Sequence, residues 1–267
     1  MNGSTTWATL AQQLTPHRHA LSGPQLLLLG VWLLTMIAIP ILLWLIGEPA
    51  LWWGVNLSVL FLVIAVLAIV HKAWGTHRTT AVVLPLLGVA WLLEWVGHTT
   101  GYPFGTYQYT AALQPQIGGV PLLIPLAWLM MLPSAWAVGA SLSGGQRGWR
   151  FVLISAAAFT AWDFFLDPQM VAWGYWQWLE GGGYFGIPWL NFAGWFLGAA
   201  LITTLVRPPA VPVVPLLMIY ILTWLLQSIG QALFWAMPGP ALVGFFAMGS
   251  FVFLITVLRP SPTYPIR

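Results

Sequence analysis

The chain has five carboxyl side chains, and three of them lie near the ends of apolar segments that lead into aromatic loops. Glu94 comes just before the loop sequence Gly97-His-Thr-Thr-Gly-Tyr-Pro-Phe-Gly-Thr-Tyr107, and Asp163 and Asp167 lie in the segment Ala161-Trp-Asp-Phe-Phe-Leu-Asp-Pro168. Carboxyl groups are costly at membrane depth, and those found there usually have a function. These three acids are therefore the first candidates for catalytic residues.

Asp163 and Asp167 are four residues apart, so they share one face of a helix. Pro168 is predicted to end that helix, which would place Asp167 at the C-terminus and Asp163 one turn deeper. A negative charge is disfavoured at that end of a helix, and two neighbouring buried acids do not ionise independently. The pair is expected to keep a proton near neutral pH and to serve as a general acid. The structural alternative is a solvated Asp167 beside a hydrogen-bonded Asp163.

Glu94 and His98 are also four residues apart on a predicted helix, so together they could hold a proton or orient a water molecule. The alternative is an ordinary ion pair at a helix end. Asn191 is an amide in the apolar segment after Pro188, where it could bond an acid or a water, or join two helices.

Aromatic residues are dense in the two segments that carry the acids. Membrane proteins enrich Trp and Tyr at the bilayer interface, which accounts for most of them. Aromatic faces also stabilise a cation by about 0.5–2 kcal/mol each. A subset is therefore expected to line a pocket for a carbocation or a polyene. The candidate substrate-binding residues are Tyr102, Phe104, Tyr107, Trp162, Tyr184, Phe185, Asn191 and Trp195.

The composition is that of a membrane protein: 60% of the 267 residues are hydrophobic, 5% are charged, and the mean hydropathy is +0.86. A soluble domain carries about 25% charged residues, so a water-soluble globule is excluded. The chain has no cysteine, which excludes disulfides, iron–sulfur clusters and thiolate nucleophiles. The net charge of +3 does not indicate a nucleic-acid partner, and the histidines on the basic side do not form a metal site.

Eight segments are long and apolar enough to span a bilayer, so the fold class is an all-α transmembrane helix bundle. All eight Lys and Arg residues then fall on one side, which the positive-inside rule makes cytoplasmic, together with both termini. We expect a polar N-terminal segment at 1–25, one transmembrane domain at 26–258 with its motifs in 81–206, and a short tail at 259–267. The predicted spans are Leu26–Ile46, Leu51–Val70, Ala81–Val96, Val120–Ala140, Trp149–Leu166, Pro188–Val206, Val213–Phe234 and Ala241–Leu258.

Two long loops share the outer side, and each contains a similar string, Gly101-Tyr-Pro-Phe-Gly105 and Gly183-Tyr-Phe-Gly186. Each also follows a helix with an acid near its end. The pattern is compatible with a weak internal repeat that builds a shared site, or with the general enrichment of Gly and aromatic residues at an interface.

The acids and loop motifs together resemble the CruF-type carotenoid hydratases, which are integral membrane proteins. The resemblance rests on Glu94 with 97–107, on Asp163 with Asp167-Pro168, and on 183–195, and it covers roughly 81–206. It implies addition of water across the terminal 1',2' double bond of an acyclic carotenoid end, giving a tertiary alcohol. It implies a carotenoid substrate dissolved in the bilayer, a bacterial plasma membrane location, and association with other enzymes of the carotenoid pathway.

This chemistry agrees with the residues, since hydration of an alkene needs a proton donor, a stabilised tertiary cation and a water. We expect the Asp163/Asp167 pair to donate the proton, and Glu94, through His98, to position and deprotonate the water. No metal, nucleotide or redox cofactor is required. A carotenoid end-group cyclase begins with the same protonation and stays open as an alternative. So do a prenyltransferase, given the spacing of Asp163 and Asp167, and a non-enzymatic carotenoid-binding or transport protein.

Overall fold

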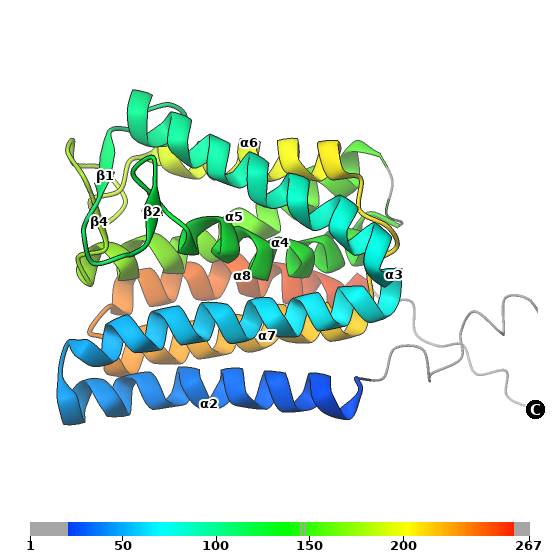
Figure 1. Cartoon of the computed structure of the whole chain (residues 1–267), viewed down its shortest axis with the longest axis horizontal. Coiled ribbons are helices and arrows are strands. Elements are labelled where there is room, and N and C mark those ends of the chain that lie inside the picture. Colours follow the sequence, from blue (N-terminus) through cyan, green and yellow to red (C-terminus); the bar gives the residue numbers. More distant parts are fainter. Residues whose placement is uncertain (1–20, 145, 147, 259–267) are drawn as a thin grey trace, which may run out of the picture.

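The computed structural model describes residues 21–144, 146 and 148–258, and about three quarters of them belong to helices (Figure 1). Seven helices of this described part are long and apolar enough to cross a membrane. The protein is thus an all-α integral membrane bundle, as the sequence predicts. The helices are α2 (Gly23–Ile46), α3 (Pro49–Thr100), α4 (Leu123–Leu142), α5 (Trp149–Ala172), α6 (Trp189–Val206), α7 (Val213–Ile229) with its π-helical extension η2 (Gly230–Phe234), and α8 (Pro238–Leu258).

Helix α3 accounts for two of the eight predicted spans. Its 52 residues would reach about 78 Å as a straight helix, far more than the roughly 30 Å of a bilayer core. The helix is broken at Gly75, whose φ of 74° and ψ of 170° are not helical and are accessible to glycine. Figure 1 shows the chain reversing there, so that 49–74 and 76–100 cross the bundle in opposite directions. The seven helices of the described residues therefore contain eight segments that are long enough to cross a bilayer.

The two ends of the bundle differ in charge. The bend at Gly75, the α4–α5 connection and the α6–α7 connection lie at one end, and the described basic residues Lys72, Arg78, Arg150 and Arg207 belong to these segments (Figure 1). The long loops at 101–122 and 173–188 lie at the opposite end. Arg18, Arg147, Arg259 and Arg267, which the topology prediction also uses, lie outside the described residues.

Helix α4 is at the centre of the bundle and packs against α3, α5 and α7. In its most apolar stretch 83% of the residues are buried, against 17% in α2 and 22% in α8. Its first turn differs from the prediction, because Val120 and Pro121 form strand β3 (Val120–Pro121) and pair with β2 (Gln116–Ile117). The helix therefore starts at Leu123.

The two outer loops are joined by a short antiparallel sheet. Strand β1 (Tyr107–Tyr109) comes from the first loop and β4 (Trp176–Trp178) from the second. Their register pairs Tyr107 with Trp178 and Tyr109 with Trp176. The two loops with similar sequences are therefore in direct contact, and they follow the helices α3 and α5 that carry the acids.

Candidate active site

The acids of α5 lie inside a continuous helix and not at its end. The prediction that Pro168 stops the helix is wrong, because α5 extends to Ala172 and places Pro168 in its interior. Asp163 and Asp167 still share one face, and both are buried, at 0% and 2% exposure.

The helix passes Pro168 because another residue takes over the bond that a proline cannot make. Proline has no N–H, so the carbonyl of Phe164, four residues earlier, lacks its usual partner. The Tyr184 hydroxyl donates to that carbonyl over 2.8 Å. A local reading of the sequence cannot detect this compensation, because Tyr184 comes from the following loop. Tyr184 thus supports the turn of α5 that carries Asp167.

Asn191, on the first turns of α6, connects the two acids. Its Nδ2 donates to Oδ2 of Asp163 over 3.0 Å and to Oδ2 of Asp167. Because both oxygens contact the same nitrogen, the two carboxyl groups must lie side by side. Oδ1 of Asp167 accepts from Trp176 Nε1 over 3.2 Å, whereas the buried Oδ1 of Asp163 has no partner among the described residues.

Glu94 is buried and accepts three hydrogen bonds. Its Oε2 accepts from the hydroxyls of Tyr107, at 2.8 Å, and Tyr109, at 2.7 Å, and its Oε1 accepts from Trp128 Nε1 at 3.1 Å. Burial is the main cause that raises the pKa of both the Tyr107 and Tyr109 hydroxyls well above the usual tyrosine value, and the charge of Glu94 is the second. Both hydroxyls therefore keep their protons and remain donors, and the set is suited to holding Glu94 as a carboxylate.

His98 does not contribute to this arrangement as expected. The structure gives no hydrogen bond between His98 and Glu94, and its buried Nδ1 lacks a partner among the described residues. Its ring lies beside the tyrosines that bind Glu94, with centroids 6.3 Å from Tyr107 and 6.0 Å from Tyr109. His98 is therefore a neighbour of the Glu94 group rather than its direct partner.

The sheet of β1 and β4 supplies most of these donors. In both strands the outer residues are aromatic and the middle residue is glutamine, and the aromatic residues are the more buried ones. Tyr109, Trp176 and Trp178 are not among the site residues predicted from the sequence. The strings Tyr-Gln-Tyr and Trp-Gln-Trp alternate with the period of a strand, and this alternation is the sequence signal that could have identified these three residues.

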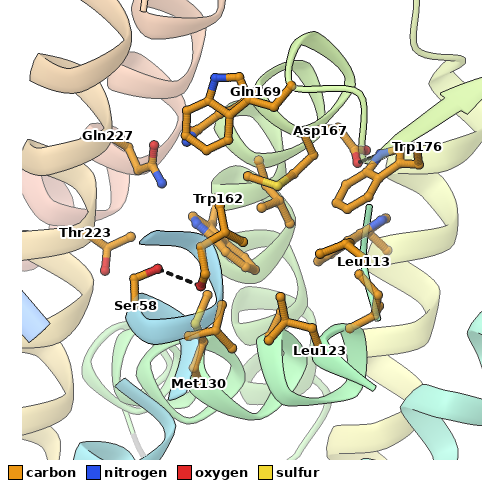
Figure 2. Close-up of a pocket in the computed structure, with 18 of the residues that line it drawn as sticks. Ser58, Leu113, Leu123, Met130, Trp162, Asp167, Gln169, Trp176, Thr223 and Gln227 are labelled. Atoms are coloured by element: carbon orange, nitrogen blue, oxygen red, sulfur yellow. Dashed lines mark hydrogen bonds between the residues drawn. The ribbon is translucent and has the colours of Figure 1, made fainter. Parts of the chain in front are cut away.

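A cavity of about 90 Å³ unites these groups. Glu94, Asp167 and Asn191 line it together, and Figure 2 shows Asp167 beside Trp176 at one side. Most of the remaining wall is apolar and comes from α2, the first half of α3, α4, α5 and the outer loops, whereas α7 contributes the polar residues Thr223 and Gln227. Glu94 and Asp167 thus face a largely apolar space, and Asp163 lies beside Asp167 without being one of the residues that line the cavity.

Aromatic faces form a substantial part of the wall. Trp195 stacks on Trp128 with ring centroids 4.9 Å apart and on Phe159 at 5.2 Å. Trp162 meets Trp195 edge to face at 6.0 Å. Trp162 and Trp195 line the cavity together with Trp176 and other rings of the outer loops. Such an aromatic wall can stabilise a cation that forms beside the carboxyl groups.

The candidate substrate-binding residues divide into two groups. Those that line the cavity are Phe104, Tyr107, Trp162, Asn191 and Trp195.

The other three candidates lie elsewhere. Tyr102 and Phe185 are 71% and 52% exposed, and Tyr184 packs with Ile187 and Phe192 in a separate cluster. None of these three is among the residues that line the cavity. Gln169, Thr223 and Gln227, which the sequence analysis leaves unassigned as site residues, do line it.

The comparison with known proteins agrees with this geometry. Residues 54–251, about three quarters of the chain, match the family model of the carotenoid biosynthesis proteins. The chain belongs to that family. Every residue that binds the three acids lies within the matched range, and the resemblance to the CruF-type hydratases is thereby confirmed.

One relative of this carotenoid biosynthesis protein is the bisanhydrobacterioruberin hydratase of Haloarcula japonica. The two are 32% identical over 112 residues. That alignment covers 41% of this chain and only 38% of the relative. No solved structure matches the chain.

Proposed function

We propose that this carotenoid biosynthesis protein adds water to the terminal 1',2' double bond of an acyclic carotenoid end and forms a tertiary alcohol. The observation that carries the proposal is the side-by-side pair of buried carboxyl groups, Asp163 and Asp167, of which Asp167 lines a largely apolar cavity together with Glu94. The hydratase named among the relatives supports the same class of reaction.

The Asp163/Asp167 pair supplies the proton. Two carboxyl groups that share one amide donor inside a protein cannot both carry a full charge without a large cost, so one of them holds a proton. That acid transfers its proton to the less substituted carbon of the double bond, and the other carbon becomes a tertiary cation. Proton transfer by a positioned general acid typically raises a reaction rate by about 10²–10⁴-fold.

The cavity then stabilises the cation and completes the addition. Glu94, which three donors hold in place, provides a nearby negative charge, and Trp162 and Trp195 provide aromatic faces worth about 0.5–2 kcal/mol each. Water adds to the cation, and a carboxylate of the cavity accepts the proton that the water releases. The alkene gains one water molecule. If the accepting carboxylate belongs to the Asp163/Asp167 pair, the proton donor is restored at once; if it is Glu94, the proton passes from Glu94 back to the pair before the next turnover.

The test is expression in two bacterial hosts, one that accumulates lycopene and one that accumulates γ-carotene. A hydratase would give a more polar pigment that is heavier by one water and has an unchanged chromophore, as read by chromatography and mass spectrometry. An isomer of unchanged mass would identify a cyclase instead, because the cation would have been trapped by a neighbouring double bond. Unaltered pigment bound to a well-expressed protein would identify a binding protein.

A further inference from the structure

Three residues that line the cavity, Trp162, Gln227 and Trp235, have a buried polar atom that no described residue satisfies, and the first two are also buried as whole residues. Nε1 of Trp162 and Oε1 of Gln227 are buried without a hydrogen-bond partner, and the two residues are only 1% and 7% exposed. Both line the cavity. A buried polar group without a partner costs about 1–3 kcal/mol, so such groups normally meet water or a ligand.

These two atoms lie away from the carboxyl group of Asp167. Trp162 comes directly before Asp163 on α5, whereas Asp167 is five residues further on, about 7.5 Å along the helix axis. Figure 2 shows Gln227 and Thr223 of α7 across the cavity from Asp167 and Trp176. A second polar region therefore faces the acids over the space that a substrate would occupy.

The two atoms have complementary hydrogen-bonding character. The indole N–H of Trp162 can only donate, and Oε1 of Gln227 can only accept. A water molecule can accept from the first and donate to the second. The hydroxyl of Thr223, one turn before Gln227, contacts only a weak acceptor, Sδ of Met131, over 3.7 Å, and can provide a third bond. The cavity of about 90 Å³ is large enough, because one water needs only about 10–15 Å³.

We propose that Trp162 and Gln227 bind the water molecule that is added to the substrate. This inference rests on the proposed hydration and adds the site of its second substrate. The Asp163/Asp167 pair protonates one carbon of the double bond from one side, and the bound water attacks the cation from the other. A C–H and a C–O bond form, the π bond is lost, and the proton released by the water passes to a carboxylate of the cavity. In this arrangement Trp162 and Gln227 position the water, and Glu94 acts as the base that accepts its proton.

Two substitutions separate water binding from proton donation. Trp162→Phe keeps an aromatic face but removes the N–H, and Gln227→Leu keeps a similar volume but removes the acceptor. Membranes that contain each variant are supplied with lycopene in D₂O. Without a positioned water, the cation still forms but returns a proton, and the carotenoid leaves unhydrated with deuterium at its terminal double bond. We expect the ratio of hydrated to deuterated, unhydrated carotenoid to fall at least tenfold in both variants, as measured by mass spectrometry.

The control is Ser228→Ala, whose hydroxyl belongs to the same helix, donates to the carbonyl of Trp224 over 2.7 Å and does not line the cavity. This variant should keep the wild-type ratio. The ratio is taken within one sample, so it does not depend on how much folded protein each variant yields. Lycopene has no oxygen, so a changed ratio assigns the site to water and not to a hydroxyl of the carotenoid.

An unchanged ratio in both variants would overturn the assignment, whether the two products stay at wild-type levels or fall together. If the wild-type protein hydrates lycopene while the ratio is insensitive to both substitutions, only the water site is refuted. If the wild-type protein hydrates neither lycopene nor γ-carotene, the proposed function fails and the water site fails with it.

Discussion

Asn191 Nδ2 lies 3.0 Å from Oδ2 of Asp163, and this bond joins the start of α6 to the middle of α5. The same nitrogen contacts Asp167, one turn further along α5. A single amide therefore holds the two acids in one orientation, and Oδ1 of Asp163 has no hydrogen-bond partner in the part of the chain that the structure describes. The arrangement makes the acid pair the first target for mutation.

Replacing Asp163 with asparagine should abolish hydration, with a loss of at least 100-fold. The substitution preserves shape and removes the acid that shares a proton with Asp167, and general acid catalysis typically contributes 10²–10⁴-fold. The measurement is the yield of hydrated pigment per amount of folded protein in lycopene-producing cells. Glu180→Gln is the matched control, because Glu180 is an exposed acid of the outer loop and should be neutral. Substantial turnover by Asp163→Asn would remove Asp163 from the mechanism.

Tyr109→Phe should lower the hydration rate by about tenfold or more. It removes the 2.7 Å hydrogen bond to Glu94, and hydrogen bonds to charged groups are worth about 1.5–3 kcal/mol. Initial rates of membrane preparations with γ-carotene or lycopene measure the effect. Tyr102→Phe removes an exposed hydroxyl from the same loop and should leave the rate unchanged. Equal rates in the two variants would mean that the charge of Glu94 does not depend on this donor.

Tyr184→Phe should destabilise the fold by about 1–3 kcal/mol, because the Phe164 carbonyl would lose the donor that compensates for Pro168. Thermal unfolding in detergent, followed by tryptophan fluorescence, measures the loss.

The control for this prediction is Tyr220→Phe. The Tyr220 hydroxyl also donates to a carbonyl of α5, that of Ala158, over 3.1 Å. That carbonyl keeps its bond within the helix, because the residue four positions later is not a proline. Tyr220→Phe should therefore cost less than Tyr184→Phe. The reverse order of the two unfolding temperatures would refute the role given to Tyr184.

Gly194→Ala should displace Phe104 from the cavity and lower both stability and activity. A Cβ at residue 194 would lie 2.6 Å from Cδ1 of Phe104 and 2.7 Å from the carbonyl oxygen of Pro103, and overpacking of this kind costs about 1–3 kcal/mol. Gly88→Ala is the control, since a Cβ there meets no atom within 4 Å. Hydration yield and unfolding temperature should fall for Gly194→Ala and stay level or rise for Gly88→Ala, because alanine favours a helix.

The sequence is informative wherever a local property decides the outcome. The eight predicted spans correspond to the seven long helices of the described residues, two of them to the halves of α3 on either side of Gly75, because hydropathy and length determine which segments can span a membrane. The spacing of Asp163 and Asp167 places them on one helical face in the prediction and in the structure. The end of the same helix is predicted wrongly, because the hydroxyl of Tyr184 bonds the Phe164 carbonyl, 20 residues earlier, that Pro168 leaves without its usual donor.

The sequence by itself determined the membrane class, the number of crossings, the resemblance to the family and the three acids worth testing. These features depend on composition and on spacing within single segments. Only the tertiary structure decided which residues complete the cavity. Tyr109 and Trp128 reach Glu94 from 15 and 34 residues away, and Trp162 and Gln227 meet the same space from different helices. Partners of this kind depend on how helices and loops pack against one another, and no local pattern encodes that packing.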